Sequence, residues 1–240
     1  MLSNEDKQIY NRLKEISIVK SLRGGMLAGH ICRIISPFCS VWFIKHKVIP
    51  NKITILMIIF GVVGSIFFML PFGWSKIVGY LFWFLWFTMD LSDGEVARYT
   101  KHFSKYGTEI DYMAHLIDHP FMNIALWLTF LSFNIIDTFT VSLLFIATIS
   151  VELVMRHIIA FQHYHENNRA ANYAQVSYLK YFATQILLYP NLIIIFTPFI
   201  ILDFYLHIGF SLYIYLVWFI YALLIFIRSV IKQLRIFYRG

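Results

Sequence analysis

Long runs of apolar residues, separated by short polar segments, dominate the pattern along this chain of 240 residues. Residues 53–70 and 208–227 contain no charged side chain. In helical form, a run of about 18–20 such residues crosses a hydrocarbon core of roughly 30 Å. Both runs are therefore predicted to span a membrane.

Four further segments are apolar for most of their length, with polar residues near an end or an internal proline: 76–98, 107–133, 138–155 and 184–201. Each can also span a membrane, which makes six spans. Residues 26–49 mix apolar with basic and histidine side chains, a composition typical of a helix in the headgroup plane, and Pro37 is expected to bend it. The predicted fold class is an all-α integral membrane protein, with six transmembrane helices preceded by an N-terminal interfacial amphipathic helix. Residues 1–49 form the cytoplasmic or interfacial segment, and residues 50–240 form the membrane domain.

The positions of Lys and Arg predict the orientation of these spans. All but one of the 20 fall in four segments: 1–52, 98–105, 156–180 and 228–239. Basic residues accumulate on the cytoplasmic side of a membrane, so both termini and these two loops are predicted to be cytoplasmic. An even number of spans agrees with that arrangement. The remaining basic residue, Lys76, is expected in a connection on the other side.

Composition agrees with a lipid environment. Hydrophobic residues make up 59% and charged residues 14% of the chain, against about a quarter charged in soluble domains. The formal net charge of +7 is explained by basic cytoplasmic loops that attract anionic headgroups, and no nucleic acid partner is expected. No cleavable signal peptide is expected either, because an early apolar segment is missing. Cys32 and Cys39 are expected to pack in a reducing compartment, without a disulfide or metal.

One polar stretch interrupts the apolar pattern at residues 90–115, which read DLSDGEVARYTKHFSKYGTEIDYMAH. Residues three, four or seven apart share a helix face, so Asp90 and Asp93 project together from one helix, and Asp111 and His115 from the next. If these helices are antiparallel neighbours, the three carboxylates converge near the cytoplasmic boundary. Converging carboxylates repel one another unless a cation neutralises them, and hard divalent ions take oxygen ligands. The stretch therefore predicts a divalent metal site.

Small and basic residues beside these acids indicate phosphoryl-group chemistry. Gly94 and Gly107 each cost about 1 kcal/mol against alanine within a helix, which suggests close approach to the backbone. Ala97 leaves space beside the acids, and Arg98 is a forked donor suited to phosphate oxygens. Taken singly, these residues also fit a solvated rim, a helix-packing contact or an ion pathway. A cation transporter that uses the three aspartates is therefore one alternative.

Seven residues of the stretch resemble, in type and spacing, the signature of the CDP-alcohol phosphotransferases, also called CDP-alcohol phosphatidyltransferases. These membrane enzymes make phospholipids and related phosphodiesters. The segment PNKIT at residues 50–54 is similar to the Pro-Asn-x-x-Thr start of that family's first span. The resemblance covers nearly the whole chain, and the seven signature residues are Asp90, Asp93, Gly94, Ala97, Arg98, Gly107 and Asp111.

The resemblance implies a homodimeric six-helix enzyme that binds a CDP-alcohol donor between the spans on the cytoplasmic side. One or two Mg²⁺ or Mn²⁺ ions would be held by Asp90, Asp93 and Asp111 around the donor pyrophosphate. An acceptor alcohol would attack the phosphorus that carries the donor alcohol, and CMP would leave. The implied nucleotide-binding residues are Asn51, Thr54, Gly94, Ala97, Arg98 and Gly107.

The sequence departs from the family pattern at its last position, where His115 replaces a fourth aspartate. That aspartate is regarded in the family as the base that deprotonates the attacking hydroxyl. Histidine, with an unperturbed pKa of about 6.5, is a competent base near neutral pH and a possible metal ligand, although it adds no negative charge. Three interpretations follow: a working base or ligand, a weakened enzyme that relies on Asp118 or another group, or a catalytically silent member that binds nucleotide or a partner.

Basic residues of the 156–181 loop are candidate contacts for the acceptor. Arg156, Arg169 and Lys180 suit a phosphorylated acceptor, and the excess of cytoplasmic positive charge explains them equally well. His163 and His165 lie in the same loop and are expected to be solvated. Neither alcohol is identified by these patterns.

Overall fold

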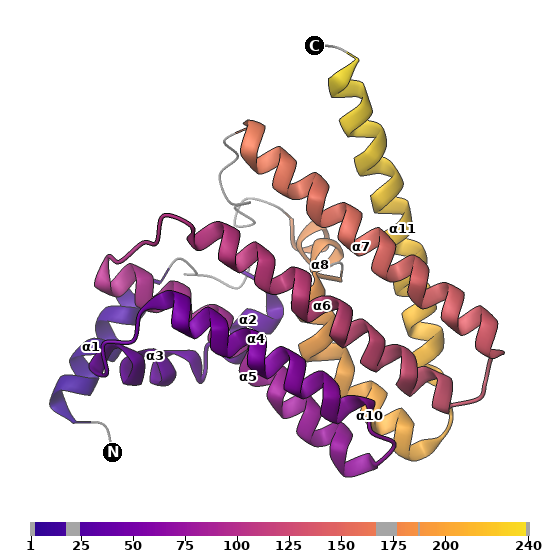
Figure 1. The fold of residues 1–240 in the computed structure, drawn as a ribbon, viewed down its shortest axis with the longest axis horizontal. Coiled ribbons are helices and arrows are strands. Elements are labelled where there is room, and N and C mark those ends of the chain that lie inside the picture. Colours follow the sequence, from indigo (N-terminus) through magenta and orange to yellow (C-terminus); the bar gives the residue numbers. More distant parts are fainter. Residues whose placement is uncertain (1–2, 18–24, 167–176, 187, 239–240) are drawn as a thin grey trace.

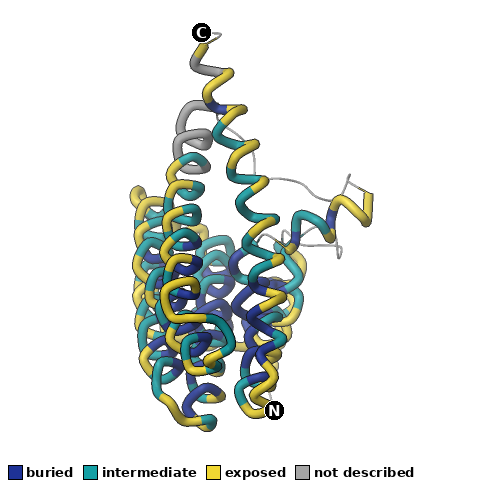
Figure 2. The backbone as a smooth tube through the Cα atoms, turned by 90° about the vertical axis from the view of Figure 1, so that its right-hand side faces the viewer, coloured by how far each residue is buried: buried dark blue, intermediate teal, exposed yellow. Residues whose placement is uncertain are grey.

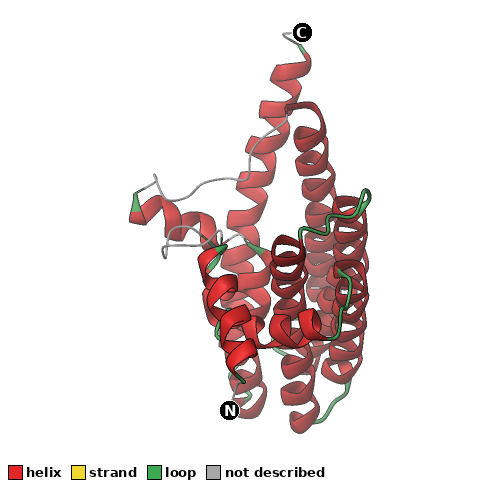
Figure 3. Cartoon of the chain, turned by 90° about the vertical axis from the view of Figure 1, so that its left-hand side faces the viewer, coloured by secondary structure: helices red, strands yellow, loops and turns green. Residues whose placement is uncertain are grey.

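Every regular element in the described part of the chain is a helix (Figures 1 and 3). The structure is a computed structural model that describes residues 3–17, 25–166, 177–186 and 188–238. Its long helices are α4 (Pro50–Met69), α5 (Gly73–Thr100), α6 (Gly107–Ser132), α7 (Thr138–Glu166) and α11 (Phe210–Phe237). The shorter elements are α1 (Asn4–Glu15), α2 (Leu27–Cys32), α3 (Ser36–Lys45), α8 (Tyr178–Ile186), α9 (Tyr189–Asn191), the π-helical turn η3 (Leu192–Phe196) and α10 (Thr197–Leu206). The all-helical class is therefore confirmed.

Four helical segments of the described residues are long and apolar enough to cross a membrane: Pro50–Met69, Thr138–Ile158, Tyr189–Leu206 and Phe210–Arg235. Helices α5 and α6, with 28 and 26 residues, are longer than the hydrocarbon core of about 30 Å is thick. Their apolar character is interrupted by the charged stretch 90–115. The chain has the build of an integral membrane protein, and a count of six spans depends on these two helices.

The predicted span 138–155 agrees with the apolar segment Thr138–Ile158, and α7 itself continues to Glu166. One predicted span boundary is wrong. The predicted span 184–201 starts too early because α8 ends at Ile186 and a new helix begins at Tyr189. Pro190 lies in the first turn of that new helix, where a missing backbone N–H costs nothing.

The N-terminal segment differs from the single bent helix predicted for residues 26–49. It forms α2 and α3, which are separated at residues 33–35, and Pro37 lies in the first turn of α3. Helix α1 was not predicted at all, although Ser3 and Asp6 form a capping box at its start. The α1–α3 group lies at one end of the long helices (Figure 1).

Specific contacts hold this group to the bundle. Ile9 and Leu13 of α1 are buried in a small apolar cluster with Val41 of α3. Lys45 Nζ donates to Asp6 Oδ1 at 2.7 Å, and this hydrogen bond lowers the pKa of the Asp6 carboxyl. Two serines of α3 bind Glu95, which lies in the charged stretch of α5. Ser36 Oγ donates to the Glu95 carboxylate at 2.9 Å, and Ser40 Oγ donates to it at 2.7 Å. The N-terminal helices are thereby tied to the helix that carries the signature.

The connections between the long helices separate into two groups (Figure 1). The turns at residues 70–72, 133–137 and 207–209 lie at one end of the bundle, and the α5–α6 loop lies at the other end, beside α1. Lys76 was expected in one of these connections, and this expectation is wrong. It is buried within α5, where its Nζ donates to Thr129 Oγ1 at 2.8 Å, so a hydrogen bond compensates for its loss of water.

Helix α4 packs against both α5 and α6, and two glycines bring its backbone close to α5. A Cβ added to Gly64 would lie 2.9 Å from the Gly79 carbonyl oxygen, and one added to Gly79 would lie 2.7 Å from that of Gly64. Phe68 and Trp83 stack beside this contact with ring centroids 4.5 Å apart. Figure 2 shows the buried residues where the helices face one another and exposed residues on the outer faces. Small residues thus set the spacing between α4 and α5, the helix that carries the first half of the charged stretch.

This contact generates a prediction about stability. Gly79→Ala should lower the free energy of unfolding by about 1–3 kcal/mol, since its methyl group meets backbone that cannot move aside alone. The thermal unfolding midpoint in detergent micelles measures the effect. Gly29→Ala is the matched control, because a Cβ there makes only an ordinary contact of 3.8 Å. Equal midpoints for both variants would contradict the account of the α4–α5 contact.

Candidate functional site

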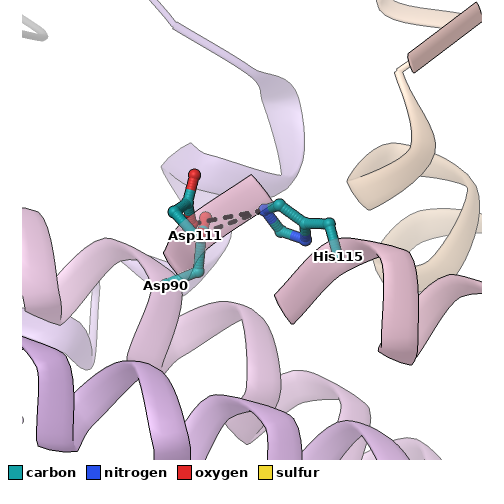
Figure 4. A group of neighbouring side chains, drawn as sticks. All are labelled: Asp90, Asp111 and His115. Carbon is teal, nitrogen blue, oxygen red and sulfur yellow. Dashed lines mark ion pairs between the residues drawn. The ribbon is translucent and has the colours of Figure 1, made fainter. Parts of the chain in front are cut away.

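Three side chains of the charged stretch meet between α5 and α6 (Figure 4). Asp90 comes from α5, and Asp111 and His115 lie one turn apart on α6. His115 Nε2 is 3.6 Å from Asp90 Oδ1 and 3.6 Å from Asp111 Oδ1. One potential ligand atom from each residue lies within 4.8 Å of the other two. We call these three residues the Asp-Asp-His triplet.

The triplet has the donor set and the accessibility of a cation site. The side chains of Asp90 and His115 are 18% and 15% exposed, and that of Asp111 is 46% exposed. Two carboxylates at this separation repel one another, and that repulsion grows in the low dielectric of a helix bundle. Hard divalent ions favour carboxylate oxygens, and an imidazole nitrogen completes a third position. The residues present therefore fit an Mg²⁺ or Mn²⁺ ion.

Asp93, the third predicted metal ligand, is not a member of the triplet. It lies one turn after Asp90, and its Oδ2 accepts a hydrogen bond of 3.0 Å from Thr54 Oγ1. Thr54 is buried near the start of α4. In the preceding turn, Asn51 Nδ2 donates to Ser104 Oγ in the α5–α6 loop at 3.2 Å. Both α4 residues predicted near the nucleotide thus contact the charged stretch.

Arg98 lies over Gly94 on α5. A Cβ added to Gly94 would be 2.9 Å from Arg98 Nη1, so a side chain there would displace the guanidinium. Arg98 Nε is buried and has no hydrogen-bond partner within the described part of the chain, which leaves a donor for an anion. Ala97 is half-buried beside it. Gly107 starts α6, and a Cβ there would make only an ordinary contact of 3.7 Å, so close approach is absent at this position.

Asp118, the alternative acid, is fully buried among α4, α5 and α6. Its Oδ2 accepts a hydrogen bond of 2.8 Å from Trp86 Nε1. A Cβ added to Gly61 of α4 would lie 2.6 Å from Asp118 Oδ1, so this glycine makes room for the carboxylate. Asp118 is held outside the Asp-Asp-His triplet.

A second polar cluster, which the sequence analysis missed, lies behind His115. Glu152 of α7 accepts hydrogen bonds from Asn123 Nδ2 at 2.9 Å and Arg156 Nε at 3.1 Å, and it pairs with His119 Nδ1. The His119 ring stacks on Tyr189 at 3.6 Å between centroids. Rings of His119 and His115 meet edge to face at 5.1 Å. An isolated acid inside an apolar run is the signal that points to such a cluster, and Glu152 provides it.

The candidate acceptor contacts of the 156–181 segment do not lie together in one site. Arg156 is bound to Glu152 and lines a cavity of about 940 Å³ that also reaches Asp111 and His115. Lys180 is exposed on α8. The side chains of His163, His165 and Arg169 lie outside those that the structure describes.

These features define a helical membrane protein with a triplet of side chains that fits a cation, beside a cavity. The family model of the CDP-alcohol phosphatidyltransferases matches residues 47–226, from the start of α4 into α11. The chain therefore belongs to the CDP-alcohol phosphatidyltransferase family. Members of this family transfer phosphate-containing groups in lipid synthesis and generally depend on a metal ion. Comparison with curated proteins gives no significant match.

Proposed function

We propose that this protein transfers a phosphoalcohol group from a CDP-alcohol to a second alcohol and releases CMP, in the synthesis of phospholipids or related phosphodiesters. The observation that carries the proposal is the convergence of Asp90, Asp111 and His115 from two helices. Such a site fits a divalent cation, which a pyrophosphate-containing donor requires for charge neutralisation. Family membership supports the same chemistry.

The acids bind and orient the donor. Asp90 and Asp111, with Asp93 beside them, would hold one or two Mg²⁺ or Mn²⁺ ions. When bound, such an ion would supply positive charge that neutralises the pyrophosphate and the departing CMP. Arg98 Nε, which has no hydrogen-bond partner among the described residues, donates to phosphate oxygens. The remaining proposed nucleotide contacts are Asn51, Thr54, Gly94, Ala97 and Gly107.

His115 is the proposed base. In this role the imidazole is not a ligand of the ion, so the lone pair of Nε2 is free. Nε2 accepts the proton of the attacking hydroxyl, and the hydroxyl oxygen forms a bond to the phosphorus that carries the donor alcohol. The bond from that phosphorus to the bridging oxygen of CMP breaks, so CMP leaves with the electron pair. Asp90, 3.6 Å from Nε2, stabilises the imidazolium that results.

The proposed membrane arrangement has six spans: α4, α5, α6, α7, the α9–α10 segment and α11. Both termini and the active site are cytoplasmic, because the basic segments lie at the end of the bundle that carries α1 and the α5–α6 loop (Figure 1). The α1–α3 group lies in the headgroup plane, where exposed Ile34, Phe38 and Trp42 contact lipid. The family resemblance supports a homodimer.

A catalytically silent member that binds nucleotide or a partner is the second candidate. The observation that favours it is His115 in the position of the family's fourth aspartate, which leaves the site one negative charge short. Nucleotide binding without CMP release would support this candidate. A cation transporter, the third candidate, would instead show cation flux into liposomes.

The acids provide the direct test of the proposed function. Purified wild type should release CMP only with Mg²⁺ or Mn²⁺, in a panel of CDP-diacylglycerol, CDP-choline and CDP-glycerol with alcohol acceptors. Asp90→Asn, Asp93→Asn and Asp111→Asn should each lower kcat by about 100-fold or more, because each removes charge that positions the donor. Asp137→Asn is the control, since Asp137 is exposed at the other end of the bundle. Near-normal kcat in all three site variants would refute the assignment.

His115, which occupies the position of the family's fourth aspartate, generates a separate prediction. His115→Ala should lose about 10²–10⁴-fold in kcat while still binding a CDP-alcohol, since a general base contributes to the chemical step. His115→Asp, which restores the family pattern, should keep substantial activity. Wild-type turnover by His115→Ala would show that His115 has no role in turnover. Asp118→Asn would then be the next variant to test. CMP release by His115→Asp alone would mean that the natural protein is silent.

Cysteine labelling tests the orientation. His102→Cys, in the exposed α5–α6 loop, should react with an impermeant maleimide only after the cytoplasmic face is opened. Thr138→Cys, exposed at the start of α7, should react in intact cells. Labelling of His102→Cys from outside intact cells would reverse the proposed topology.

A further inference from the structure

A cavity of about 940 Å³ extends from the Asp-Asp-His triplet into the bundle. Its volume is near the upper end of the range of roughly 300–1,000 Å³ for small-molecule sites. Asp111 and His115 form part of its wall, so whatever fills the cavity lies against the proposed base. The rest of the wall comes from α6, α7, the 188–190 segment and α11.

The wall contributed by α11 is apolar throughout, with Trp218, Phe219, Ala222 and Ile225. On α7, the apolar Val151 and Met155 line the cavity among the polar Thr148, Glu152 and Arg156. These positions lie within the segments Thr138–Ile158 and Phe210–Arg235, which are apolar enough to cross a membrane. A polyol placed against the α11 wall would lose its hydrogen bonds to water without replacement, whereas a hydrocarbon chain would be stabilised there.

Polar lining residues gather on α6 and the facing part of α7. Thr108, Glu109 and Tyr112 come from the first turns of α6, next to Asp111, and Arg156 comes from α7. The cavity thus has polar groups on α6 and α7, next to the triplet, and an apolar wall on α11. That distribution matches an amphiphile with one polar end.

The cavity lies on the acceptor side of the triplet. Asp93, Gly94 and Arg98, which belong to the proposed nucleotide side, are absent from its wall, whereas His115 is part of it. Because the base must touch the hydroxyl that it deprotonates, the cavity next to His115 is the place for the attacking alcohol. Helices α7 and α11 are also the least buried of the four candidate spans.

We infer that the acceptor is a membrane-resident alcohol with a hydrocarbon tail, bound with its hydroxyl at His115 and its tail between α7 and α11. This inference rests on the proposed function and names the class of its second substrate. A lipid acceptor reaches the site from within the bilayer, while the CDP-alcohol reaches it from the aqueous side. Trp218 and Ala222 are the residues that determine the shape of the tail site.

Filling the cavity tests the inference. Purified protein is supplied with CDP-choline or CDP-glycerol, and CMP release is compared with dioctanoylglycerol and with glycerol as acceptors. Wild type should prefer dioctanoylglycerol by at least about tenfold in kcat/KM, as expected when apolar burial separates the two acceptors. Ala222→Trp should lower kcat/KM for dioctanoylglycerol by at least about tenfold and leave the KM for the CDP-alcohol unchanged. Leu224→Trp is the matched control, because Leu224 is 60% exposed on the outer face of α11.

Other outcomes of this assay overturn the inference. Equal kcat/KM for glycerol and dioctanoylglycerol, unaltered by Ala222→Trp, would leave the proposed function standing and refute the lipid acceptor. Turnover of CDP-diacylglycerol with soluble acceptors only, with its KM raised by Ala222→Trp, would assign the cavity to a donor tail. A wild type and a His115→Asp variant that release no CMP from any donor would refute the proposed function, and the acceptor with it.

A second measurement does not depend on turnover. A long-chain alcohol that carries a photoactivatable diazirine at its tail should label peptides containing Met155 or Trp218. Ala222→Trp should lose this labelling, and Leu224→Trp should keep it. Retained binding of CDP by Ala222→Trp shows that the variant is folded. Labelling that avoids these peptides, or that persists in Ala222→Trp, would refute the tail site.

Discussion

Electrostatic repulsion between two carboxylates, Asp90 and Asp111, is the constraint on which the site depends. The fold brings them to a common point with His115 Nε2, with all three potential ligand atoms within 4.8 Å. Two like charges about 4 Å apart repel by about 4 kcal/mol at an effective dielectric constant near 20. Such an arrangement persists in a stable protein when a cation or a proton offsets the repulsion. A divalent ion, on which members of this family generally depend, would supply that compensation.

Helix α4 is what holds the two acids in position, since it packs on both α5 and α6. Gly64 lets the α4 backbone approach α5, and Gly61 leaves room for the buried Asp118 of α6. Thr54, at the start of the same helix, donates to Asp93. The geometry of the site therefore follows from close helix packing as much as from the signature residues themselves. The cavity beside His115 lies where α7 and α11 meet α6, and its apolar wall comes from α11.

The features that sequence predicted best are those with a local cause. Apolar runs determine the helices, and a spacing of four residues places Asp111 and His115 on one face, where the structure has them. Contacts between different helices could not be predicted, because they depend on which helices are neighbours. The Glu152 cluster joins α6 to α7, and the hydrogen bond of Asp118 requires Trp86 of α5. Local signals were also overlooked, among them the capping box of α1 and the proline in the first turn of α9.

The central claim is that Asp90 and Asp111 form a divalent-cation site with His115 beside the reacting phosphorus. Electron paramagnetic resonance of Mn²⁺ bound to the purified protein in the presence of CDP tests this claim most directly. The account predicts tightly bound Mn²⁺ in the wild type and its loss in the Asp90→Asn, Asp111→Asn double variant, with Asp137→Asn unchanged. Equal Mn²⁺ binding by the wild type and the double variant would contradict it.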